Sequence, residues 1–172
     1  MRKTICLLPL ALGTFGLGLT EFVMMGILPD TAKAMQVSIP AAGNFISLYA
    51  LGVVTGAILL VLSARTKPLK TILIWLMSIF TIANLLTAAA FNYHVFCTMR
   101  FLAGLPHGAF FGVGAIAAGK IADNDKGNQA VATMVAGMTV ANLLGIPLGT
   151  FISHNFSWRI TCLLYTSDAA DD

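Results

Sequence analysis

Residues 95–119 read VFCTMRFLAGLPHGAFFGVGAIAAG, an apolar run of 25 residues in which Arg100 is the single charged side chain. A helix needs roughly 20 mainly apolar residues to cross the hydrocarbon core of a bilayer. A charge at that depth costs several kcal/mol and normally marks the path of an ion or a substrate. The run therefore predicts a membrane-spanning helix that holds a functional residue.

Four other stretches have the same character, which predicts an all-α polytopic membrane protein. They cover residues 5–28, 45–64, 71–91 and 130–152, and a sixth run starts at Trp158. The chain is 58% hydrophobic and 10% charged, with a mean hydropathy of +0.86, whereas a soluble domain carries about 25% charged residues. A soluble protein with an all-apolar core is disfavoured, because buried core helices seldom run this long without charge.

Basic residues predict which ends of the spans face the cytoplasm. The start Met1-Arg2-Lys3 also suits a signal peptide, but signal h-regions are only about 7–15 residues long, so we interpret residues 5–28 as a retained membrane helix. With a cytoplasmic N-terminus, the inside segments hold seven basic residues and the outside segments two, as the positive-inside rule requires. The inside residues are Arg2, Lys3, Arg65, Lys67, Lys70, Lys120 and Lys126, and the outside residues are Lys33 and Arg159.

Small residues at four-residue spacing predict which helix faces pack closely. Such rows let helix backbones approach each other, which drives helix association in lipid. General bundle packing is enough to explain most of them. Pro106 and Pro147 each free a backbone carbonyl and can kink their helices. The small residues are Gly52 and Gly56 in the second span, Gly104, Gly108 and Gly112 in the fourth, and Gly137, Ala141, Gly145 and Gly149 in the fifth.

Glu21 and Arg100 are the two charged residues within the predicted spans. Counting along helices of 1.5 Å rise places them at similar depth, roughly 10 Å and 8 Å below the outer edge of the membrane. A salt bridge or a water-mediated pairing would lower the cost of burying both, and Glu21 would then be a candidate proton carrier. The alternative is a permanent ion pair that only holds the first and fourth spans in register.

Other polar residues in the spans complete the predicted proton-coupling or substrate path. His107 follows Pro106 in the middle of the fourth span. Because histidine titrates near neutral pH, it is a candidate proton relay, and a helix–helix hydrogen bond is the alternative. Asn142, with Asn84 and Thr139, is predicted to form interhelical hydrogen bonds or to line a cavity.

No pattern of catalytic or metal-binding residues stands out. Cys6, Cys97 and Cys162 form no CxxC pair, so the sequence predicts neither a disulfide framework nor a metal site. Residues 114–120 read GxxxxGK, the start of a phosphate-binding loop, but Ile121 stands where the motif needs Ser or Thr, and no strand precedes it. We expect no enzyme activity, no cofactor and no nucleic-acid partner.

Three stretches resemble motifs of the major facilitator superfamily, in the order and spans that this family has. Residues 100–115 (RFLAGLPHGAFFGVGA) resemble its fourth-helix motif, which opens with an arginine and continues with spaced glycines. Residues 137–151 (GMTVANLLGIPLGTF) are similar to the fifth-helix motif of its antiporters. Residues 11–29 (ALGTFGLGLTEFVMMGILP) are similar to the first helix of its drug and sugar efflux branch. The ensemble most resembles the AraJ-type sugar or arabinose efflux permeases.

The resemblance implies a twelve-helix fold of two six-helix halves, with a central cavity, alternating access and export driven by inward proton flow. By motif position it assigns Arg100 to proton coupling, and Gly145, Pro147 and Gly149 to the core of the antiporter motif. One loop departs from the family. Residues 62–70 (LSARTKPLK) keep the basic residues but lack the acidic residue and the glycine, so a conformational latch is not expected there.

The resemblance extends to about residue 161, where the sixth span fails. Residues 162–172 read CLLYTSDAADD, which cannot complete a span of about 20 residues, and we expect this tail to be non-native. The sequence thus predicts the N-terminal six-helix half of a twelve-helix fold, truncated in helix six.

The predicted function is that of part of a bacterial inner-membrane transporter that exports small molecules in exchange for protons. Sugars, nucleosides and amphiphilic drugs all remain open as substrates. The expected partners are the substrate, protons, the lipid bilayer and a C-terminal half of the same transporter. The alternative is a small five-span membrane protein that serves as a structural or assembly partner without transport.

Overall fold

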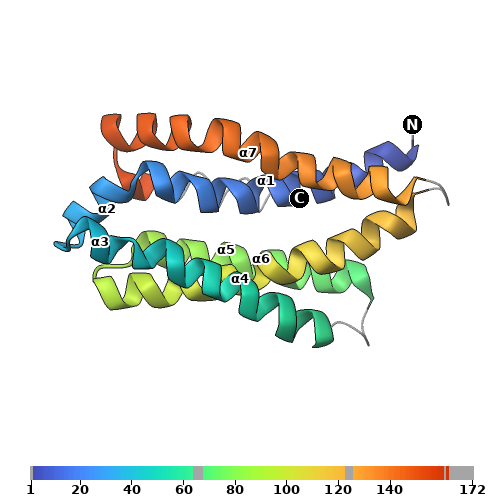
Figure 1. The fold of residues 1–172 in the computed structure, drawn as a ribbon, viewed down its shortest axis with the longest axis horizontal. Coiled ribbons are helices and arrows are strands. Elements are labelled where there is room, and N and C mark those ends of the chain that lie inside the picture. The colour runs from blue at the N-terminus through green and yellow to red at the C-terminus, as the bar shows by residue number, and fades with distance from the viewer. Residues whose placement is uncertain (1, 64–67, 123–125, 161, 163–172) are drawn as a thin grey trace.

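The computed structural model describes residues 2–63, 68–122, 126–160 and 162, and Figure 1 shows their helical arrangement. Five of the described helices are long and apolar enough to cross a membrane, which confirms the predicted spans. Residues 64–67 and 123–125, and the predicted tail apart from Cys162, lie outside the described residues. The five helices are α1 (Arg2–Gly26), α4 (Asn44–Ser63), α5 (Leu69–Ala89), α6 (Tyr93–Ile121) and α7 (Gly127–Asn155).

The ends of the helices differ from the predicted spans by a few residues, because polar side chains cap or continue them. α6 begins at Tyr93 instead of residue 95, since the Asn92 side chain accepts a 2.9 Å hydrogen bond from the backbone N–H of Val95. α7 runs on to Asn155, past the last apolar residue of the predicted span. An apolar run therefore predicts the presence of a helix more accurately than the residues at which the helix begins and ends.

Two short helices, α2 (Leu28–Ala34) and α3 (Ile39–Ala42), join α1 to α4. Pro29 lies in the first turn of α2, where its missing N–H removes no helical hydrogen bond. The Ser38 side chain caps α3 by accepting a 3.3 Å hydrogen bond from the backbone N–H of Ala41. These helices lie at the end of the bundle (Figure 1), so the first predicted span stops two residues early, at Gly26.

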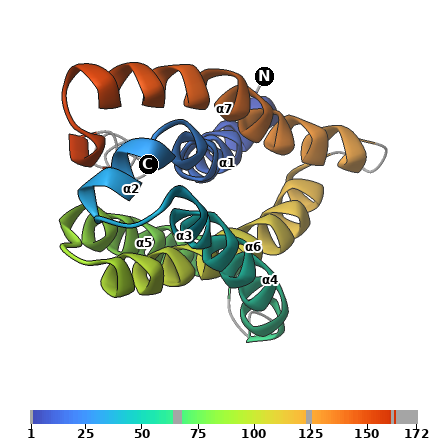
Figure 2. The same cartoon turned by 60° about the vertical axis from the view of Figure 1, so that its left-hand side comes forward.

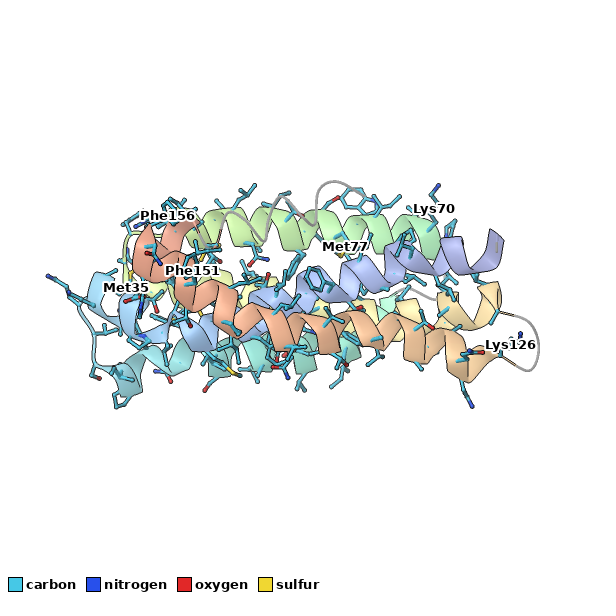
Figure 3. All side chains as sticks on the ribbon, turned by 90° about the horizontal axis from the view of Figure 1, so that it is seen from above. Met35, Lys70, Met77, Lys126, Phe151 and Phe156 are labelled. Atoms are coloured by element: carbon cyan, nitrogen blue, oxygen red, sulfur yellow. The ribbon has the colours of Figure 1, made fainter. Side chains whose placement is uncertain are left out.

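The long helices form two groups that lie side by side (Figure 2). α1 packs chiefly against α7, whereas α6 packs against both α4 and α5. Lys70 and Lys126 lie at one end of the bundle, and Met35 and Phe156 lie at the other (Figure 3). The two groups meet where α6 faces α1 and α7, and Glu21, Arg100 and His107 lie at that boundary.

Glycines let the backbones of α4 and α6 touch. A methyl group placed on Gly108 would overlap the carbonyl oxygen of Val53, and one placed on Gly56 would overlap that of Leu105. Gly104 approaches Gly52 in the same way. Close packing of small residues stabilises helix pairs in lipid, so the predicted packing role of these glycines applies to the α4–α6 contact. Gly112, the next residue of the row, is half-buried.

The small residues of α7 form a second close contact, with α1. The hydroxyl of Thr14 reinforces it by donating a 2.5 Å hydrogen bond across the contact to the carbonyl oxygen of Met134. Pro147 lies within this stretch of α7 but faces away from α1 and is exposed. The predicted antiporter-motif residues therefore include four that pack against α1. The contacts are Gly137 with Ala11, Ala141 with Gly18, Gly145 with Leu19, and Gly149 with Val23.

Candidate functional site

Four polar side chains from three helices meet at the boundary between the two helix groups. Glu21 comes from α1, Tyr49 from α4, and Arg100 and His107 from α6. Arg100, His107 and Tyr49 are 2%, 3% and 1% exposed, respectively. The side chain of Glu21 is 27% exposed, so Glu21 is the least buried member of the cluster. Two apolar clusters border the site, one around Phe45 and Phe96 and the other around Leu17 and Phe110.

Backbone carbonyl groups hold Arg100 in place. Its Nε donates to the carbonyl oxygen of Phe45 in α4, and one terminal nitrogen donates to that of Thr20 in α1, both at 3.4 Å. Its guanidinium lies 4.1 Å above the centre of the Tyr49 ring, a cation–π contact. Its other terminal nitrogen has no hydrogen-bond partner within the described part of the chain. Arg100 thus joins α1, α4 and α6 mainly through main-chain oxygens.

The expected salt bridge between Glu21 and Arg100 does not form among the described residues. Among the described residues, the carboxylate of Glu21 has the imidazole of His107 within 4.0 Å, but not the guanidinium of Arg100. The Arg100 charge still acts on the carboxylate electrostatically. The contact of Arg100 with Thr20 puts Glu21 and Arg100 at a similar level along the bundle, but a common level does not specify the direction in which each side chain leaves its helix. Glu21 therefore stays near the cation without being bound to it.

His107 links the carboxylate to the interior of the bundle. Its Nδ1 lies 2.7 Å from the Tyr49 hydroxyl, and its Nε2 lies 3.9 Å from Oε2 of Glu21. The ring of Phe111 stacks on the imidazole, with ring centres 5.3 Å apart. The structure thus contains the helix–helix hydrogen bond that the sequence offered as one alternative for His107. It also places the other ring nitrogen beside the predicted proton carrier.

Tyr49 is the member of the site that the sequence analysis missed. A tyrosine near the start of a span is typical of the membrane interface, yet this one is fully buried between α4 and α6. One signal could have found it. Tyr49, Gly52 and Gly56 occupy positions i, i+3 and i+7, which share one face of a helix. Because the two glycines pack against α6, that spacing also directs Tyr49 toward α6.

The remaining polar residues of the predicted path lie elsewhere. Asn142 is exposed on α7 and does not join Glu21, Arg100 and His107. Asn84 is buried on α5, and its amide donates a 2.9 Å hydrogen bond within its own helix to the carbonyl oxygen of Phe80. With Thr20, Thr87 and Arg100 it lines a small cavity beside the cluster. The described residues contain no group of three or more His, Cys, Asp or Glu side chains that could hold a metal ion.

Comparison of the sequence with protein families identifies the family to which the chain belongs. Residues 10–166 match the profile of the Major Facilitator Superfamily, which covers most of the 172-residue chain. The chain belongs to this superfamily. Its five membrane-length helices correspond to part of the N-terminal half of the superfamily fold, as the sequence motifs predicted.

The chain is similar in sequence to several bacterial proteins. The chain is 53% identical over 164 residues to the AraJ protein of Escherichia coli strain K12, a match that covers 95% of this chain and 41% of AraJ. It is 46% identical over 163 residues to the inner membrane transport protein YdhP of the same strain, covering 95% of this chain and 42% of YdhP. A chloramphenicol resistance protein of Streptomyces lividans is 31% identical over 152 residues, covering 88% of this chain and 39% of that protein. The chain therefore spans about two fifths of the length of these relatives.

Proposed function

We propose that the full-length protein containing this chain is a secondary transporter that exports small molecules in exchange for protons. Membership of the superfamily supports transport. Proton coupling is inferred from the one carboxylate found in a membrane-length helix within the described residues, that of Glu21. An ionisable residue inside a membrane span is by default a functional residue. The observation that carries the proposal is the placement of Glu21, half-exposed on one side and facing buried Arg100 and His107 on the other.

The site suits a group that binds and releases a proton during transport. Glu21 is the least buried member of the cluster, and we infer that a proton reaches its carboxylate without passing through the packed helices. The Arg100 cation lies close enough to act on the charged form electrostatically. Because backbone oxygens hold Arg100 independently of Glu21, the carboxylate can gain a proton while the arginine keeps its position. Protonation then changes the charge at the boundary without breaking an ion pair.

Protonation at this boundary offers a way to couple charge to helix movement. Glu21 belongs to the α1–α7 group, whereas Tyr49, Arg100 and His107 belong to the α4–α5–α6 group. A change of charge on Glu21 alters the attraction between the two groups. Alternating access in transporters depends on such relative movements around a central site. We therefore infer that the proton acts on the relative position of these helix groups as well as on the second half of the transporter.

The proposed setting is the bacterial inner membrane, with the N-terminus in the cytoplasm. Lys70 and Lys126 lie at one end of the bundle, the end at which α1 begins (Figures 1 and 3), which agrees with the positive-inside rule. For the substrate we propose sugars or related compounds, on the resemblance to sugar efflux permeases. Amphiphilic drugs are the second candidate class, because one relative is named for chloramphenicol resistance.

Transport by the full-length protein in liposomes tests this function. The vesicles are prepared with an acidic lumen, and radiolabelled arabinose or chloramphenicol is added outside. Proton-coupled exchange predicts that the substrate accumulates inside while a trapped pH indicator reports loss of luminal protons. Accumulation that is equal with and without the pH gradient would contradict proton coupling. If neither arabinose nor chloramphenicol accumulates but another compound causes proton release, the proposed substrate class is wrong and the proposed proton coupling stands.

A further inference from the structure

We propose that Tyr49 is a positioning residue for the proton-coupling site. Its hydroxyl donates a hydrogen bond to Nδ1 of a neutral His107, so that Nε2–H of the same ring faces Glu21. The inference rests on the proposed function of Glu21 and adds a residue that neither the sequence motifs nor the relatives indicate. It is carried by one chain of contacts from α4 through α6 to α1. The Tyr49 hydroxyl lies 2.7 Å from Nδ1, and Nε2 lies 3.9 Å from the carboxylate oxygen.

The donor and acceptor roles follow from the chemistry of the two ends. A neutral imidazole carries one N–H, and its other nitrogen accepts. An ionised carboxylate offers only acceptors, so the nitrogen that faces Glu21 has to be the one that carries the hydrogen. Nδ1 is then the acceptor, and the Tyr49 hydroxyl has to donate to it. The opposite arrangement would direct the lone pair of Nε2 at a negative charge.

Packing fixes Tyr49 well enough to orient the imidazole. Its ring is 1% exposed and lies under the guanidinium of Arg100, 4.1 Å from ring centre to Cζ. On α4 it precedes Gly52, where the backbones of α4 and α6 touch. A donor on such a rigid support holds the imidazole in one orientation, with help from the stacked ring of Phe111. The 3.9 Å separation between Nε2 and the carboxylate is longer than a direct hydrogen bond, so Nε2–H faces the carboxylate as an electrostatic contact in this structure.

Tyr49 also connects Arg100 and His107 of α6. Its ring contacts Arg100 and its hydroxyl contacts His107, which lie seven residues apart, two turns along the same helix face. Loss of the hydroxyl removes the hydrogen bond to His107 and leaves in place the two ring contacts, with Arg100 and, in an edge-to-face arrangement, with the imidazole. This separation makes Tyr49→Phe a specific test. Tyr93→Phe is the matched control, because the Tyr93 hydroxyl bonds Asn44 and the carbonyl oxygen of Ala41, away from the site.

The first measurement is nitrogen NMR of the full-length protein labelled with 15N-histidine, with His107→Gln used to assign the signals. We expect His107 to show an unprotonated Nδ1 and a protonated Nε2, and we expect the Nδ1 signal to shift in Tyr49→Phe but not in Tyr93→Phe. A protonated Nδ1 in the wild type, in either the other tautomer or the imidazolium, would overturn the proposal. This result does not depend on transport, so it stands apart from the test of the proposed function.

The second measurement is a double-mutant cycle on the maximal rate of proton-driven efflux. Tyr49→Phe should lower that rate by about tenfold, with the substrate KM unchanged, because the tyrosine acts through His107 instead of contacting the substrate. His107→Gln should cause a similar loss of rate. Tyr49→Phe should cause no further loss in the His107→Gln background, because the effects of substitutions at residues that act through one another are not additive. Additive losses, or a Tyr49→Phe rate equal to that of Tyr93→Phe, would show a merely structural role. If Glu21→Gln keeps full proton-driven efflux, the proposed function fails instead.

Discussion

One terminal nitrogen of Arg100 lies 3.4 Å from the carbonyl oxygen of Thr20, the residue that immediately precedes Glu21 in α1. The arginine therefore donates a hydrogen bond to the backbone next to Glu21, and not to the Glu21 carboxylate itself. This arrangement separates two tasks that a salt bridge would combine. In this structure Arg100 joins α1 to α4 and α6, and the carboxylate of Glu21 is left without a bond to the guanidinium, as the proposed proton-binding role requires.

Replacement of Glu21 by glutamine should abolish proton-driven efflux by the full-length protein. Glutamine keeps the shape of the side chain but cannot titrate, and no other carboxylate lies within the described membrane-length helices. Folded yield should be unchanged, because Glu21 is half-exposed and makes no ion pair with Arg100. Efflux against a substrate gradient in liposomes measures the effect, with Asp30→Asn at the end of the bundle as the control. A Gln variant that exports at the wild-type rate would remove Glu21 from the mechanism.

Replacement of Arg100 by alanine should reduce stability as well as transport. Two buried carbonyl groups lose their donors, and hydrogen bonds to charged groups contribute about 1.5–3 kcal/mol each. Arg100→Lys should restore part of the loss, because it keeps the charge but not the planar fork. Thermal unfolding of the detergent-purified variants measures the change.

The pairing of charges can be tested in the same series. Since Arg100 bonds backbone oxygens, Glu21→Gln added to Arg100→Gln should leave the melting temperature of the single Arg100→Gln variant unchanged. Recovery of most of the lost stability in the double variant would instead indicate a salt bridge between Glu21 and Arg100.

A methyl group at Gly108 should destabilise the bundle, whereas one at Gly119 in the same helix should not. The methyl of Gly108→Ala would overlap the carbonyl oxygen of Val53, while nothing lies within 4 Å of a methyl at Gly119. Overpacking of this kind costs about 1–3 kcal/mol. Unfolding in a graded series of SDS concentrations compares the two variants. Equal stability of the two would show that α4 and α6 are farther apart than described.

The 172-residue chain on its own should not transport. It spans about two fifths of the length of its relatives, and alternating access needs movement between two repeats around a site at their interface. Purified chain in liposomes should give no proton release when substrate is added, whereas the full-length protein should. Substrate-dependent proton flux from the short chain would contradict this and would point to a transport unit formed by several copies.

Sequence alone was enough for the membrane helices, because length and apolar composition determine a span almost independently of its neighbours. It also identified Gly104, Gly108 and Gly137 as packing residues, since their spacing defines a helix face. The sequence did not specify which helix packs against each of these faces. The structure assigns the row in α6 to α4 and the row in α7 to α1, a pairing that depends on the arrangement of all five helices.

The site was harder to predict for a related reason. Counting residues predicted a similar depth for Glu21 and Arg100, but rotation of α1 and α6 about their axes decides whether the side chains meet. Asn142 was grouped with them because it is polar inside a span, yet it lies on the exposed face of α7. Tyr49 was overlooked because tyrosine is common both at membrane interfaces and in helix packing. Its role becomes visible only when His107 and Arg100 are placed around it.

The contact between the backbones of α4 and α6 has a consequence for leakage. Where Gly52, Gly56, Gly104 and Gly108 bring the main chains together, no gap remains for even a single file of water molecules. Protons can cross membranes along such files, and the contact between α4 and α6 leaves no room for one between these two helices. In the transporter proposed above, a leak of this kind would dissipate the proton gradient that drives export. Close packing of these glycines would therefore preserve the driving force on which the proposed role of Glu21 depends.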